Sequence, residues 1–103
     1  MNFMRPSDFI TTKAWDALPI AEIEGATVRL HWTDRPYIWH VNDGAEVFVV
    51  LEGAVTMHYR RGGQEYRRAM RAGDICHAEP GDEHVAHPDG PAHILVIEKK
   101  GSV

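Results

Sequence analysis

Residues 40–53 read HVNDGAEVFVVLEG, and this stretch decides the fold. Because a β-strand sends residues i, i+2 and i+4 to one face, the even positions of the stretch share a face. The residues on that face are His40, Asn42, Glu46, Phe48 and Val50. The odd positions 47, 49 and 51 are apolar as well, so one acid lies in a run that is apolar on both faces. A buried carboxylate is costly without a partner, and we expect Glu46 to pair with another group or bind a cation.

A second stretch, residues 73–84, reads GDICHAEPGDEH and ends in a histidine just after a Pro-Gly turn. The two stretches supply two imidazoles and one carboxylate, from His40, His84 and Glu46. Such a set with open positions suits non-haem iron and its neighbours among the transition metals. We predict that these three residues bind a divalent metal (Fe, Mn, Ni or Zn). Asn42, on the same face, is a fourth and weaker candidate ligand, because its amide oxygen is neutral.

The two stretches together resemble the two motifs of the cupin superfamily, and most closely those of its small single-domain members. The positions that match the motifs are His40, Glu46, Gly53, Gly73, Gly81 and His84. The positions that depart from them are Asp34 for the first glycine, Asn42 for a second histidine, Glu79 with the proline displaced to Pro80, and Pro88 for a final asparagine. The resemblance covers residues 34–88. Since the third imidazole is missing, we expect the metal to be weakly held.

The resemblance implies an all-β fold, a double-stranded β-helix of the jelly-roll type that forms a cupin barrel with the metal in its lumen. It also implies a homodimer that packs sheets and exchanges N-terminal strands. Small members of this kind are often labelled sugar-phosphate-isomerase-like, a label that rests on the barrel and not on chemistry. Fold alone does not fix function.

The rest of the chain agrees with this fold, since short strand-like runs alternate with Gly, Pro, Asn and Asp turn signals. The expected strands cover residues 20–24, 26–33, 37–41, 45–51, 54–60, 64–70, 74–78, 85–87 and 93–99. No stretch has a convincing helical period. We expect residues 1–19 to form an N-terminal arm that a dimer could exchange, and residues 20–103 to form one barrel domain.

Composition restricts the function classes. The chain has 103 residues, enough for one domain with its own core, and a net charge of −4 that argues against generic nucleic-acid binding. Its single cysteine excludes an internal disulfide, and no run reaches the roughly 20 apolar residues of a membrane span. The first residues lack the apolar core of a signal peptide. A cytoplasmic protein is the expectation.

Two function classes remain open. The first is a protein that binds a divalent metal and a small organic ligand in the lumen, with oxygenase or isomerase activity; the second is a non-catalytic binding or sensing protein with a weak or lost metal site. Neighbouring acids or bases would favour an enzyme, and the sequence offers only Tyr37, His77 and His87. Other polar residues receive no role: His31, His58 and His93 are expected on strand surfaces, Cys76 as a small buried hydrophobe, and the arginines around Gly62-Gly63 on a solvated hairpin.

Overall fold

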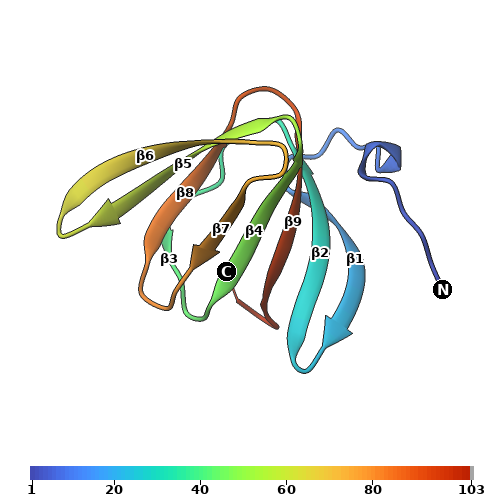
Figure 1. Cartoon of the computed structure of the whole chain (residues 1–103), viewed down its shortest axis with the longest axis horizontal. Coiled ribbons are helices and arrows are strands. Elements are labelled where there is room, and N and C mark those ends of the chain that lie inside the picture. The colour runs from blue at the N-terminus through green and yellow to red at the C-terminus, as the bar shows by residue number, and fades with distance from the viewer. Residues whose placement is uncertain (103) are drawn as a thin grey trace.

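The computed structural model describes residues 1–102 and contains nine β-strands and one short 3-10 helix (Figure 1). The elements are η1 (Pro6–Asp8), β1 (Asp16–Ile23), β2 (Ala26–Thr33), β3 (His40–Val41), β4 (Glu46–Glu52), β5 (Ala54–Arg61), β6 (Gln64–Arg71), β7 (Ile75–Ala78), β8 (Glu83–Pro88) and β9 (Ala92–Lys99). All nine expected strands are present, within a few residues at each end. The prediction of an all-β fold is confirmed.

Two antiparallel sheets face one another. One has the strand order β1-β2-β9-β4-β7, and the other has the order β3-β8-β5-β6. Strands distant in sequence therefore pair, such as β2 with β9 and β5 with β8, which is the jelly-roll arrangement. The core between the sheets includes Phe48, Val50, Val55, Ile94 and Val96.

Strand β4 follows the alternation expected from its sequence. Glu46, Phe48 and Val50 are buried, whereas the residues between them are only half-buried. Strand β9 lies beside β4 in the same sheet, and the register places Glu98 directly opposite Glu46. Glu98 is also buried, so the interior holds two acids at one position of the sheet.

The chain enters the barrel earlier than the sequence indicated. Strand β1 begins at Asp16 rather than at Ile20, because Asp16 already pairs with Trp32 and the ladder continues across an irregularity between Pro19 and Ala21. The segment before β1 begins away from the barrel, at residues 1–5 (Figure 1), and Phe3 is 89% exposed. The Nε2 of His93 lies 3.1 Å from the Phe9 carbonyl oxygen and ties the base of this segment to β9.

The expected strand over 37–41 is shorter than predicted. Only His40 and Val41 form β3, because residues 34–39 cross between the sheets as a loop. The Tyr37 N–H still donates to the Ala86 carbonyl, so the loop lies against β8. Within residues 1–102 no helix is long and apolar enough to cross a membrane.

Gly53 joins β4 to β5 at a point where a side chain has no room. Its φ is +80°, and a Cβ there would lie 2.4 Å from the Pro91 carbonyl oxygen, whereas Gly25 has the same φ with no atom within 4 Å. We expect Gly53→Ala to lower the free energy of unfolding by about 3 kcal/mol and Gly25→Ala by about 1 kcal/mol, because only the former adds a clash to the strained backbone. Urea denaturation measures both. Equal losses would show that Pro91 does not restrict Gly53.

Candidate metal centre in the barrel lumen

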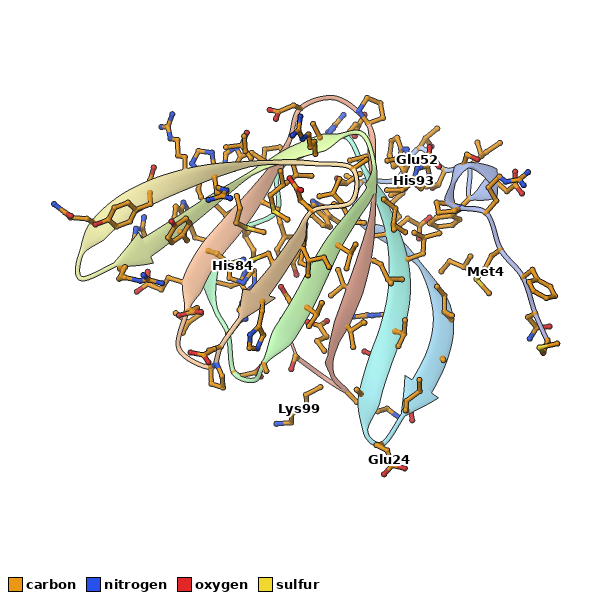
Figure 2. All side chains as sticks on the ribbon, viewed as in Figure 1. Met4, Glu24, Glu52, His84, His93 and Lys99 are labelled. Carbon is orange, nitrogen blue, oxygen red and sulfur yellow. The ribbon has the colours of Figure 1, made fainter. Side chains whose placement is uncertain are left out.

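The structure brings His40, Glu46 and His84 together from three strands. One ligand atom from each lies within 4.8 Å of the other two. Strands β3 and β8 pair with His40 opposite His84, and the two imidazole centroids are 4.4 Å apart. Figure 2 shows His84 in the interior between the sheets. The three residues predicted as ligands thus lie at a common point, and metal binding there stays a prediction.

His40 is oriented for metal binding through Nε2. Its Nδ1 lies 2.9 Å from the Ile38 carbonyl oxygen, and since a carbonyl only accepts, Nδ1 carries the proton. In the neutral ring Nε2 then holds a lone pair. This atom is buried and has no partner. A hydrogen bond that fixes the tautomer in this way is the usual support for a metal-binding histidine.

Asn42 lies in the turn after β3 and contacts His84. Its Oδ1 accepts a hydrogen bond of 2.8 Å from His84 Nε2, and its Nδ2 is buried without a partner. His84 therefore carries its proton on Nε2 and leaves Nδ1 unprotonated and unpartnered. To offer Nε2 to a metal, His84 must give up the bond to Asn42, a cost of about 1 kcal/mol. Asn42 is thus a competitor for His84 as well as a candidate ligand.

Burial keeps the side chains of Glu46 and His84 uncharged at neutral pH. Burial, with a smaller effect from the nearby His40, lowers the pKa of His84 to about 4, so its imidazole is neutral at pH 7. Burial raises the pKa of Glu46 to about 8, and a hydrogen bond to Glu98 and the charge of Glu98 act in the same direction. Glu46 is therefore protonated at neutral pH and must lose a proton to bind a cation.

Two charged residues that line the lumen were not predicted to do so from the sequence. Arg29, on β2, forms an ion pair with Glu98, and both line the same cavity as His40, Glu46 and His84. Position 29 lies in a strand of mixed polarity, and Glu98 follows a run in which both parities are apolar, so neither pattern shows which face is inward. The register of β9 against β4 was the missing information.

The lumen is a cavity of about 270 Å³ with an aromatic wall. Trp15, His31, Tyr37 and Phe48 line it. Trp15 packs edge-on against Tyr37 at 5.2 Å, and Tyr37 packs against His40 at 5.4 Å. The expectation that His31 lies on a strand surface is wrong: it shares the inward face of β2 with Arg29, and burial lowers its pKa.

The three candidate acids and bases are separated by the fold. Tyr37 lies in the lumen beside His40. His77 is exposed and lines a different cavity, and His87 packs against His58 on the opposite face of its sheet, with ring centroids 4.1 Å apart and the rings tilted by 33°. Only Tyr37 is thus placed to act on a ligand in the lumen.

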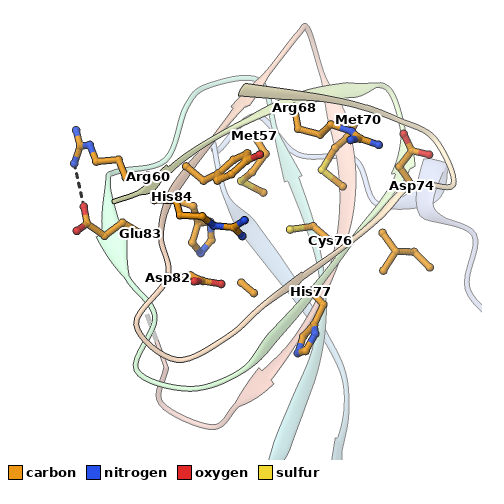
Figure 3. Close-up of a pocket in the computed structure, with 14 residues that line it drawn as sticks. Met57, Arg60, Arg68, Met70, Asp74, Cys76, His77, Asp82, Glu83 and His84 are labelled. Carbon is orange, nitrogen blue, oxygen red and sulfur yellow. Dashed lines mark hydrogen bonds and ion pairs between the residues drawn. The ribbon is translucent and has the colours of Figure 1, made fainter. Parts of the chain in front are cut away.

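A second cavity of about 350 Å³ opens between β7 and the β5–β6 hairpin (Figure 3). Met57, Met70 and Cys76 point into it, and Arg60 forms an ion pair of 3.2 Å with Glu83 at its rim. Cys76 is half-buried against the core, and burial raises the pKa of its thiol, in agreement with the role of a small hydrophobe.

The raised pKa of Glu46 predicts a pH dependence for the stability of the metal-free protein. Since folded Glu46 keeps its proton from its ordinary pKa of 4.5 up to about 8, the associated stability is complete below 4.5 and is lost as the pH rises toward 8. His84 acts in the opposite sense but only between about 4 and 6.5. Between pH 6.5 and 7.5 the free energy of unfolding should fall by about 1 kcal/mol.

Urea denaturation in EDTA at several pH values measures this slope. Glu46→Gln cannot titrate and should show a flatter profile above pH 6.5. A slope that is the same in the wild type and in Glu46→Gln would contradict the assignment of the titration to Glu46.

Comparisons with known proteins agree with the fold. A family model described as "Cupin domain" matches residues 26–98, and no curated protein matches the chain. A cupin-2 domain protein of Shewanella frigidimarina is 25% identical, with a TM-score of 0.77 over 87% of this chain and 85% of that one. A Ralstonia eutropha protein assigned provisionally as a mannose-6-phosphate isomerase is 17% identical, with a TM-score of 0.76 over 96% of this chain and 98% of that one.

A larger protein shares the fold as well. Hydroquinone 1,2-dioxygenase PnpCD, solved in complex with Fe3+, is 18% identical and has a TM-score of 0.77, over 87% of this chain and 29% of that one. The match to the family model spans most of the sequence, including both strands that carry Glu46 and His84. The chain is therefore a member of the cupin family.

Proposed function

We propose that this cupin binds a divalent transition metal (Fe, Mn, Ni or Zn) through His40, Glu46 and His84, and a small organic ligand beside it in the lumen. The observation that carries the proposal is the buried, unpartnered Nε2 of His40, within 4.8 Å of ligand atoms of Glu46 and His84. A neutral imidazole with its lone pair free fits a metal ion. The Fe3+ in the dioxygenase of the same fold supports this assignment.

When bound, a metal ion at this point would supply Lewis-acid or redox chemistry to a ligand in an open position. The chain itself contributes orientation and a dry environment. The Ile38 carbonyl fixes the tautomer of His40, the aromatic wall confines a flat ligand, and Tyr37 provides a hydroxyl group within the lumen. An oxygenase or an isomerase is the enzyme that these features favour.

The second candidate is a non-catalytic binding or sensing protein. It is favoured by the hydrogen bond between Asn42 and His84, which holds His84 in a tautomer unsuited to metal binding through Nε2. It is also favoured by the placement of His77 and His87, two of the three predicted acids and bases, outside the lumen lining. For an enzyme, His84→Ala should abolish turnover and leave the barrel folded, whereas for a sensor it should weaken ligand binding alone.

Metal content tests the first proposal. Because binding requires the loss of the Glu46 proton and of the Asn42–His84 bond, we expect less than one metal ion per chain, easily removed by EDTA. Asn42→His should tighten binding by adding an imidazole, and Glu46→Gln should loosen it by removing the charge. Elemental analysis by mass spectrometry, on protein purified without a chelator or a histidine tag, measures this.

Two further variants make the result decisive. Asn42→Ala tightens binding if Asn42 only competes for His84, and loosens it if the amide oxygen is a ligand. Equal metal content in the wild type, in Glu46→Gln and in the His40→Ala, His84→Ala double variant would refute the site.

We also propose that the protein is a homodimer that uses its N-terminal segment. That segment exposes Met1, Phe3 and Ile10, each at least 87% exposed, and residues 1–5 lie away from the barrel, whereas η1 lies beside β4 (Figure 1). Exposed apolar groups gathered on one segment favour a protein contact. A second copy of the chain is the partner that a symmetric assembly provides.

Light scattering at micromolar concentration should give the mass of a dimer. Deleting residues 1–8, which leaves the contact of Phe9 with His93 and all of β1 intact, should weaken the dimer at least about tenfold by removing the exposed side chains of Met1 and Phe3. A monomeric full-length protein would refute the dimer. An unchanged dimer affinity after the deletion would exclude residues 1–8 from the interface.

A further inference from the structure

The lumen contains a cation whose hydrogen-bonding capacity is only partly used. A guanidinium has five N–H donors, and among residues 1–102 the Arg29 side chain donates only through Nη2, to Glu98. Its Nε is buried and has no partner. The Arg29 side chain is 34% exposed and lines the lumen cavity, so its unused donors include ones that an acceptor in the cavity can reach.

The position of Arg29 relative to the candidate metal centre suggests what that acceptor is. Arg29 lies across the ladder from Val96, two residues before Glu98 on β9, and Glu98 lies opposite Glu46. Arg29 and the candidate metal ligands therefore line one cavity, Arg29 and Glu46 from one sheet and His40 and His84 from the other. A single small molecule can reach both.

The rest of the lining restricts the size and shape of that molecule. A volume of about 270 Å³ lies just below the range of about 300–1,000 Å³ for pockets that hold drug-sized ligands, so it suits a molecule of one ring. The wall formed by Trp15, Tyr37 and Phe48 offers ring faces and edges. A planar carboxylate can accept two parallel hydrogen bonds from the guanidinium fork.

We propose that Arg29 anchors the carboxylate of a small aromatic acid, a proposal that rests on the proposed function of the lumen as a ligand site. Glu98 positions Arg29 by accepting a hydrogen bond from Nη2 and leaves the remaining N–H donors of the guanidinium for the ligand. The ring lies along the aromatic wall, and the opposite end of the ligand faces His40 and His84. Arg29 is thus a binding residue that selects anionic over neutral ligands.

Benzoate and its neutral isostere benzamide test the anchor in EDTA-treated protein, so that the result does not depend on the metal. Isothermal titration gives the affinities, and the NMR signal of the Trp15 indole N–H reports binding in the lumen that Trp15 lines. We expect the wild type to prefer benzoate at least about tenfold, as is typical of a hydrogen bond to a charged group. Arg29→Met should reduce this preference to about one.

Three further variants distinguish a ligand-binding role of Arg29 from a structural one. Arg29→Lys keeps a positive charge beside Glu98 and should retain the fold but lose most of the preference, because an ammonium lacks the planar fork. Glu98→Gln removes the competing carboxylate and should strengthen benzoate binding without affecting benzamide. Arg35→Met is the matched control: Arg35 is exposed and outside the cavity lining, so the preference should be unchanged.

Several outcomes would overturn the anchor. These are equal binding of benzoate and benzamide to the wild type, no binding of either, or an undiminished preference in Arg29→Met. Loss of the preference in Arg68→Met instead would place the anion in the second cavity. Metal content measured in parallel keeps the two proposals apart, since Arg29→Lys, which keeps the positive charge near Glu46, should retain the metal of the wild type while ligand variants of His40 and His84 lose it.

Discussion

The two backbone hydrogen bonds of Asn42 hold the site together. Its N–H donates to the Asp82 carbonyl at 2.9 Å, and its carbonyl accepts from the Gly81 N–H at 2.8 Å. These bonds join the turn after β3 to the turn before β8 and bring His40 opposite His84. Because only backbone atoms take part, residue 42 can change its side chain without disturbing the junction. The chemistry of the centre can therefore vary at Asn42 while the geometry of the histidines is kept.

The strands were predictable from the sequence because each one has a local residue pattern. Alternation in β4 and the turn signals at Gly53 and Gly62-Gly63 are local, and they fixed the strands on either side. The start of β1 was missed because it depends on pairing with β2 and not on a local pattern. Residues 37–39 were wrongly predicted as strand because Tyr37 and Trp39 have high β propensity, whereas the Tyr37 N–H is bound to the Ala86 carbonyl in a loop.

The candidate site, like the strands, was predictable from the sequence only in part. Parity placed Glu46 inward, and the motif spacing brought His40 and His84 to the same place, as the structure shows. The tautomers of both histidines depend on contacts with Ile38 and Asn42 that no spacing reveals. The positions of Arg29, His31 and Glu98 in the lumen were not predicted, because the inward face of β2 and β9 is defined only by the neighbouring strands.

The opposed acids in the lumen make this barrel less stable than its architecture allows. Glu46 and Glu98 occupy positions that β4 and β9 otherwise fill with Phe48, Val50, Ile94 and Val96. Replacing buried ionic groups by apolar residues of similar volume is often neutral or stabilising, by up to about 4 kcal/mol. A chain selected only for folding would therefore carry aliphatic side chains at positions 29, 46 and 98 together, since an aliphatic residue at position 98 alone would leave the Arg29 charge unpaired. These polar residues are thus a feature that folding alone does not require.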